Sequence, residues 1–94
     1  MEFDWSNTPF EWDGSLTPQI VEETFEDPFG IRLLPDSPRF SVQARYINLG
    51  RTNGGVGVFS VYRTNGKSIR VIAARPFTSE EQFFYQRKVN QSLG

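Results

Sequence analysis

The side chains of this chain that could do chemistry are mostly arginines, because the sequence contains no histidine and no cysteine. Without these residues, a histidine-dependent nucleophilic triad is excluded and a typical zinc site is not expected. The carboxylates are concentrated in the N-terminal third and show no spacing typical of metal ligands. The glycine-rich stretch 54–57 does not match a phosphate-binding loop. We therefore expect neither a metal nor another cofactor.

Arginine, lysine, tyrosine and amide side chains can bind phosphates through charge and paired hydrogen bonds. Tyr46 and Phe59 could stack on bases, as aromatic residues do in single-stranded RNA readers. Cleavage of RNA by its own 2′-hydroxyl needs little more than alignment, a proton acceptor and charge neutralisation at the phosphate. A surface of arginine and tyrosine, with one glutamate, could supply these functions without a metal.

Each candidate residue also has a structural explanation. Arg70 could be a solvated sheet arginine, and Arg75 could pair with Glu81 or cap a carbonyl group. Glu81 is better explained as a partner of Thr78 in a capping box. Tyr46 could pack beneath the N-terminal segment. Both explanations stay open for each residue.

The charges are divided unequally along the chain. Residues 1–36 hold nine acids and one base, whereas residues 37–94 hold nine bases and two acids, so the net charges are −8 and +7. Such asymmetry predicts either a basic surface for an anionic partner or two halves that neutralise each other within one fold.

With 94 residues, the chain is long enough for a single domain, 1–94. The absence of cysteine excludes a disulfide framework and fits a reducing compartment. The N-terminus lacks the basic and apolar regions of a signal peptide, and no apolar stretch is long enough to cross a membrane. We therefore expect a cytoplasmic location.

Capping and turn residues in the sequence predict where the helices and strands that position these side chains begin and end. Thr17-Pro18 predicts a helix start that Asp27-Pro28 ends, and a short strand follows over 29–34. Asn53-Gly54 and Asn65-Gly66 predict two hairpins that join three strands. A last helix begins at the capping box after residue 77. The sequence predicts an α+β fold, with an antiparallel sheet of about four strands packed by two helices.

Two-residue turns at both Asn-Gly pairs would fix the strand register. Leu49 would then lie opposite Val58, and Val61 opposite Arg70. One face would be mostly apolar and would pack under a helix. The other would be mixed, and it would carry Tyr46, Asn48, Phe59 and Arg70. A bulge would exchange some of these assignments.

Several motifs together resemble the BrnT toxins of bacterial type II toxin–antitoxin systems. The first is the helix that ends in Phe25-Glu26-Asp27-Pro28, and the second is the strand 45–51, which ends in Gly-Arg. The third and most specific is the run 70–75 followed by Thr78, Glu81 and Tyr85. The resemblance covers most of residues 15–89.

The resemblance implies a RelE-like fold and a metal-independent endoribonuclease, held inactive by a small ribbon-helix-helix antitoxin that binds DNA. On this hypothesis Arg70 and Arg75 would neutralise the phosphate, Tyr46 would align a base or sugar, and Glu81 would accept a proton. The RNA-binding residues would be Arg45, Arg51, Lys67, Arg63 and Asn48.

Residues 1–14 are atypical of that family. The segment 6–14 is too short for the family's N-terminal helix, and the Lys-His pair that ends that helix is missing. The alternative is therefore a catalytically inactive BrnT-like module that binds a protein partner or single-stranded RNA. The acidic N-terminal segment could also fold over the basic sheet and imitate an antitoxin.

Overall fold

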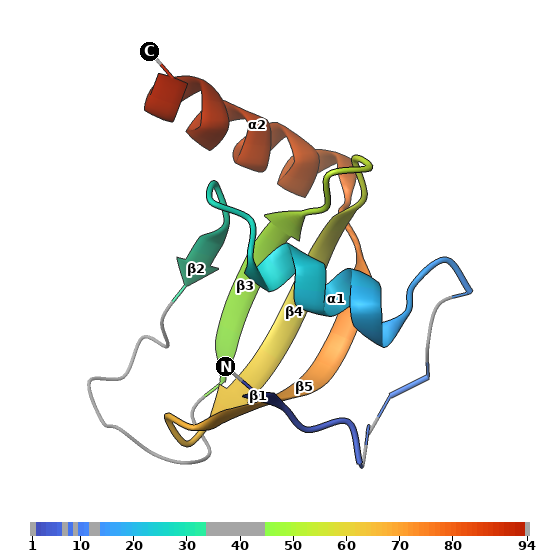
Figure 1. The fold of residues 1–94 in the computed structure, drawn as a ribbon. Coiled ribbons are helices and arrows are strands. Elements are labelled where there is room, and N and C mark those ends of the chain that lie inside the picture. The colour runs from blue at the N-terminus through green and yellow to red at the C-terminus, as the bar shows by residue number, and fades with distance from the viewer. Residues whose placement is uncertain (1, 7, 9, 12–13, 34–44, 94) are drawn as a thin grey trace.

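The computed structural model describes residues 2–6, 8, 10–11, 14–33 and 45–93. Within them it has a five-stranded sheet in the order β1-β5-β4-β3-β2 and two helices (Figure 1). The strands are β1 Glu2–Phe3, β2 Ile31–Leu33, β3 Tyr46–Arg51, β4 Gly57–Thr64 and β5 Ser68–Pro76, and the helices are α1 Pro18–Phe25 and α2 Ser79–Leu93.

The predicted α+β class is confirmed, and so is the meander of β3, β4 and β5. The sheet is mixed rather than antiparallel, because β1 adds to the edge of β5 in parallel. Of the predicted strand 29–34, residues 31–33 form β2, which pairs with β3, whereas Phe29 and Gly30 lie before the strand. Residue 34 lies outside the described residues.

Helix α1 crosses one face of the sheet (Figure 1). It begins where predicted, because the Thr17 hydroxyl accepts a hydrogen bond from the backbone of Ile20 at 3.2 Å. Its backbone passes close to β3 at Gly50, where a Cβ atom would lie 2.1 Å from the carbonyl oxygen of Thr24. Only glycine fits this approach. The core beneath α1 is built from Leu16, Val21, Phe25, Val58, Tyr62, Ile69 and Val71.

Helix α2 begins at the predicted capping box. The Glu81 amide donates to the Thr78 hydroxyl at 3.2 Å, and the Thr78 amide donates to the Glu81 carboxylate at 2.8 Å. Tyr85 and Val89 are the buried hydrophobic residues of this helix among those described. Neither described helix is both long and apolar enough to span a membrane.

The predicted register is wrong at both hairpins. Leu49 lies opposite Phe59 rather than Val58, and Arg70 lies opposite Arg63 rather than Val61. At the second turn, the side-chain Oδ1 atom of Asn65 accepts hydrogen bonds from the backbone amides of residues 67 and 68, both at 2.9 Å. Asn65 therefore shapes the turn through its side chain, and its backbone does not adopt the positive φ that a two-residue Asn-Gly turn requires. The connection between β4 and β5 is accordingly longer than two residues.

A β-bulge on β5 shifts the pairing again. Val61 pairs with Ala73, but the next residue, Tyr62, pairs with Val71, so Ile72 has no partner of its own. The extra residue of a bulge reverses the alternation of side chains, so residues an odd number of positions apart across it point to the same face of the sheet. Arg70 and Arg75, which are five positions apart, consequently lie on the same face.

Candidate functional site

We call the side of the sheet opposite α1 the arginine face. Its residues alternate along each strand with those that face α1. The arginine face consists of Ile47, Leu49, Arg51, Phe59, Val61, Arg63, Arg70, Ala73 and Arg75. The rows of this face run from a pair of arginines at the β4–β5 hairpin, through aliphatic residues, to an aromatic ring near α2. Charge at both ends and apolar atoms between them suit a ligand that has both phosphates and bases.

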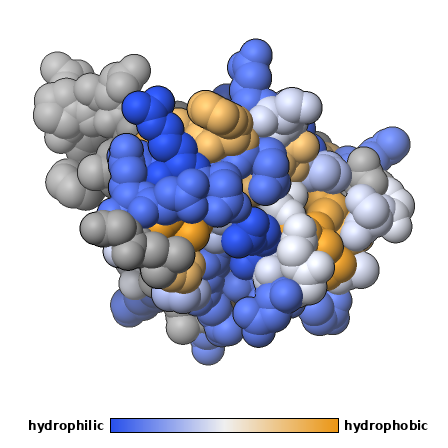
Figure 2. Space-filling view, turned by 90° about the horizontal axis from the view of Figure 1, so that it is seen from above, coloured by the Kyte–Doolittle hydropathy of each residue, from blue (hydrophilic) through white to orange (hydrophobic). Residues whose placement is uncertain are grey.

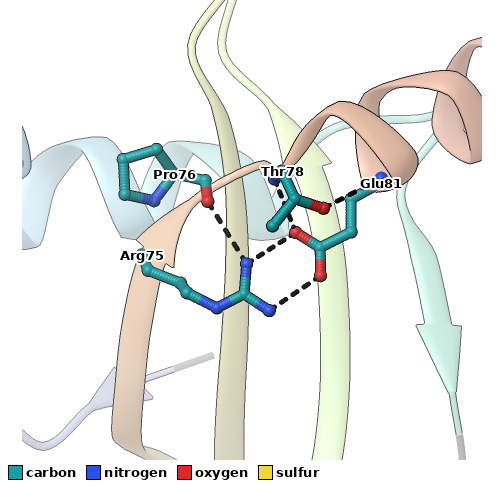
Figure 3. Close-up of polar contacts among 4 residues, drawn as sticks. All are labelled: Arg75, Pro76, Thr78 and Glu81. Carbon is teal, nitrogen blue, oxygen red and sulfur yellow. Dashed lines mark hydrogen bonds and ion pairs between the residues drawn. The ribbon is translucent and has the colours of Figure 1, made fainter.

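Near α2, Arg75 contacts two other side chains, those of Phe59 and Glu81. Its guanidinium lies 4.1 Å from the ring centroid of Phe59, which is the residue opposite it in the sheet. It also pairs with both carboxylate oxygens of Glu81, at 2.6 and 2.8 Å (Figure 3). The hydrogen bonds with Arg75 lower the pKa of Glu81, so this carboxylate is a weaker proton acceptor than an ordinary glutamate. The Arg75 side chain is still 46% exposed.

Arg51 also has partners within the chain. Its guanidinium lies over the ring of Tyr85, 5.0 Å from the centroid, and donates to Gln86 at 3.2 Å. The Tyr85 hydroxyl donates to Asp27, which also accepts from the backbone amides of Arg51 at 2.8 Å and Phe29 at 2.9 Å. Burial, followed by the hydrogen bond to Asp27, raises the pKa of Tyr85 to about 12.

This second group of contacts joins the end of α1 to β3 and α2. It borders a pocket of about 370 Å³, but the polar atoms of Asp27, Arg51 and Tyr85 described above are already engaged with one another. We therefore interpret the cluster of Asp27, Arg51 and Tyr85, which we call the α2 joint, as a structural connection. Arg51 is correspondingly less available to RNA than the sequence predicts.

At the other end of the face, the arginines have fewer partners among the described residues. Arg63 and Arg70 lie directly opposite each other on β4 and β5. Arg70 donates to Asp4 at 3.1 Å, and its side chain is 51% exposed. The Nε atom of Arg63 is buried and has no hydrogen-bond partner among the described residues. Like charges that lie opposite each other in a sheet are destabilising. Among the described residues, Asp4 is the acidic partner of this arginine pair, so one of the two positive charges is not neutralised.

The structure does not bring all of the predicted site residues together. Tyr46 stacks on Tyr62, with ring centroids 5.5 Å apart, and packs against the core beneath α1. Asn48 is 1% exposed on the same side. Both lie on the face opposite Arg70, because the real register differs by one residue from the predicted one. Neither is placed to contact a ligand on the arginine face.

The remaining predicted RNA-binding residues lie at the edges of the site. Arg45 is exposed and immediately precedes β3, where the pairing of β3 with β4 would extend toward Arg63. Lys67 is exposed in the β4–β5 hairpin. Arg45, Arg63, Lys67 and Arg70 thus gather at the hairpin end of the sheet.

Sequence reasoning missed Asp4 as a site residue. Asp4 follows β1 and reaches Arg70, 66 positions later, because β1 lies beside β5. Hydrogen bonds from Ser6, followed by that from Arg70, lower the pKa of Asp4 to about 2. Phe3, Trp5 and Phe10 instead pack against the core on the α1 side. The described part of the N-terminal segment therefore wraps the sheet edge, and it reaches the arginine face at Asp4.

The end of the molecule seen from above shows no single large apolar area among the described residues. Hydrophobic surface there is divided by hydrophilic residues (Figure 2). Phe83 and Phe84 on α2 are 71% and 40% exposed, and the Lys88 ammonium lies 6.0 Å from the Phe84 ring centroid. Scattered apolar residues are normal on a protein surface and do not by themselves indicate a docking site.

Within the part of the chain that the structure describes, no group of three or more acidic side chains could hold a metal ion. Comparison of the chain with protein-family models, curated proteins and solved structures gave no match. The BrnT resemblance and the RelE-like fold therefore stay predictions from the sequence motifs.

Proposed function

We propose that this protein binds single-stranded RNA across the arginine face. The observation that carries the proposal is the bulge at Ile72, which places Arg70 and Arg75 on one face together with Arg63 and Phe59. The rows of Arg63 and Phe59 are four residues apart along β4, or roughly 13 Å. Phosphates can bind at the arginines, while a base stacks against the face of the Phe59–Arg75 pair.

RNA fits this arrangement better than a protein partner does. The exposed groups are guanidiniums, which form paired hydrogen bonds with phosphate oxygens. Ile47, Val61 and Ala73 form a partly buried apolar strip between them. A flexible single strand can direct its bases toward such a strip and its phosphates toward the two charged ends.

Cleavage of RNA, with a RelE-like fold and a BrnT-type role, is a second candidate. One observation favours it: Arg70, Arg75 and Glu81 are all accessible from the same side of the sheet. Two observations count against the predicted mechanism. Tyr46 lies on the other face, and the pKa of Glu81 is lowered by its pairing with Arg75. The ribbon-helix-helix antitoxin that the resemblance implies stays a prediction.

A binding experiment in EDTA tests the proposal. Fluorescence anisotropy of a labelled single-stranded RNA should show salt-dependent binding, and Arg70→Gln and Arg75→Gln should each weaken it about tenfold, as expected when a charge-assisted hydrogen bond is removed. Each substitution should also reduce the slope of log K against log salt by about 0.7 for each phosphate that is no longer neutralised. Arg87→Gln, which removes the same charge from an exposed position on α2, is the matched control and should change little.

The same samples separate binding from cleavage. If a denaturing gel shows intact RNA after incubation at saturating protein, the protein binds without cleaving. Shortened RNA with the wild type, and intact RNA with Arg70→Gln, would establish the second candidate. Equal binding by the wild type, Arg70→Gln and Arg75→Gln would contradict the assignment of the arginine face.

A further inference from the structure

A recess of about 270 Å³ lies at the hairpin end of the arginine face. The hairpin joins β4 to β5 and closes that end of the sheet, beside β1 (Figure 1). The residues that line the recess are Asp4, Arg63, Thr64, Asn65, Ser68 and Arg70. Its walls therefore combine two guanidiniums, one carboxylate and a polar turn.

The described residues only partly neutralise the two arginines of the recess. These arginines are directly opposite each other, and among the described residues that line the recess the single carboxylate belongs to Asp4. Asp4 contacts Arg70, whereas the buried Nε of Arg63 has no acceptor in the described ranges. The two guanidiniums and the one carboxylate leave the described lining of the recess with a net positive charge, so the recess favours an additional anion.

The walls of the recess are already ordered. The Thr64 hydroxyl donates to the carbonyl of Ser68 at 2.8 Å and accepts from the amide of Gly66 at 3.0 Å. Asn65 accepts from two further amides of the turn, as described above. The turn therefore needs no ligand to hold its shape, which lowers the entropic cost of binding there.

Asp4 occupies the position of an anion in this site. Its carboxylate accepts from Arg70 at 3.1 Å and from the amide and hydroxyl of Ser6, at 3.0 and 2.5 Å. It belongs to the short N-terminal stretch after β1, which has only two strand residues, and its side chain is 36% exposed. An incoming ligand with more negative charge can compete with this single exposed carboxylate for Arg70.

We propose that the recess binds a phosphomonoester at the end of an RNA strand, and that this group displaces Asp4 from Arg70. A phosphomonoester carries a charge of roughly −1.5 to −2 at pH 7 and has three acceptor oxygens. An internal phosphodiester carries one negative charge, so the monoester better matches two adjacent guanidiniums. Thr64, Asn65 and Ser68 of the hairpin line the recess, so the end of a strand that lies along the arginine face can reach it. This inference rests on the proposed function.

The experiment compares three RNAs of one sequence, with a 5′-phosphate, with a 3′-phosphate, or with hydroxyl groups at both ends. One of the phosphorylated RNAs should bind the wild type about tenfold more tightly than the unphosphorylated RNA, as expected for added charge-assisted hydrogen bonds. Arg63→Gln should remove this advantage. Arg75→Gln, at the other end of the face, should weaken binding of all three RNAs and keep the advantage.

Substitution of Asp4, whose carboxylate competes with the phosphate for Arg70, should increase RNA affinity rather than decrease it. Asp4→Asn removes the charge and keeps the size, so it should strengthen binding of the phosphorylated RNA by several fold. Glu2→Gln is the control, because it removes an acidic charge from β1 at an exposed residue that does not line the recess. Arg63→Met, which also removes the charge, serves as a second variant if circular dichroism shows that Arg63→Gln is not folded.

The outcomes separate this inference from the proposed function. Equal binding of all three RNAs by the wild type would overturn the recess assignment and leave RNA binding intact. If none of the RNAs binds, the proposed function fails, and titration with a nucleoside monophosphate, followed by NMR, tests the recess alone. Saturable shifts that Arg63→Gln abolishes would support a phosphomonoester site, and unchanged spectra would refute it.

Discussion

The two ends of the arginine face contain the same residue type in opposite situations. At the end near α2, Arg75 has the carboxylate of Glu81 and the ring of Phe59, and Arg51 has Tyr85 and Gln86. At the hairpin end, Arg63 and Arg70 line a recess in which the described residues place one carboxylate, that of Asp4.

The element that follows each strand explains this difference. Strand β5 leads into α2, whose first turns supply a carboxylate and whose middle supplies an aromatic ring. The β4–β5 hairpin supplies hydroxyl, amide and backbone groups that bond among themselves. The first end therefore contributes to folding, whereas the described residues of the second end keep a net positive charge, which suits the proposed RNA ligand. Four predictions test this division, from the largest expected effect to the smallest.

Loss of the Tyr85 ring should cause the largest change. Tyr85 is 1% exposed and connects Phe77, Arg51 and Asp27. Tyr85→Ala should lower the free energy of unfolding by about 3–5 kcal/mol, as is typical of buried aromatic residues. Tyr85→Phe should cost less, about 1–3 kcal/mol, because only the hydrogen bond is removed. Urea denaturation measures both, and a small effect of Tyr85→Ala would show that the α2 joint is not structural.

Equivalent substitutions of one arginine from each end should have unequal effects on stability. Arg51→Met removes a cation–π contact and a hydrogen bond, so it should lower the free energy of unfolding by about 1–2 kcal/mol. Arg63→Met removes a buried donor that has no acceptor among the described residues, so it should change stability by less than about 0.5 kcal/mol, or increase it. RNA affinity should instead fall more in Arg63→Met than in Arg51→Met. If both variants lose the same stability, the contrast between the ends is wrong.

The α2 joint should also respond to alkaline pH. The pKa of Tyr85 is raised from 10.0 to about 12, so the folded state favours the protonated hydroxyl more strongly than the unfolded state does. This contribution is complete below pH 10 and is lost as the pH rises from 10 toward 12. Thermal unfolding of the wild type should therefore shift to lower temperature across this interval relative to Tyr85→Phe. Parallel pH profiles for the two proteins would contradict the role assigned to the hydroxyl.

The parts of the fold that could be predicted from the sequence are those governed by local hydrogen bonds. The Thr17 cap and the box between Thr78 and Glu81 depend on residues at most three positions apart, and both are confirmed. The sheet register was not predictable in this way. Asn65 can build a turn either with its backbone or with its side chain, and the same two-letter motif occurs in both connections.

The site depends more strongly on these unpredictable features than the fold does. A shift of one residue moved Tyr46 to the core side, and the bulge at Ile72 joined Arg70 to Arg75. No residue type in the run 71–74 signals a bulge. The contact of Asp4 with Arg70 depends on an edge strand that pairs in parallel across most of the chain, which local patterns cannot show.

The smallest expected effect concerns the counterion of Arg75. Glu81→Gln retains a side chain that can complete the capping box but removes the negative charge beside the guanidinium. RNA affinity should rise about threefold, because an exposed ion pair is worth about 0.2–1 kcal/mol and its removal frees Arg75 for phosphate. Glu80→Gln, at the preceding exposed position, is the matched control for net charge. An equal rise in both variants would indicate a general charge effect, whereas a fall specific to Glu81→Gln would mean that Glu81 holds Arg75 in its binding position.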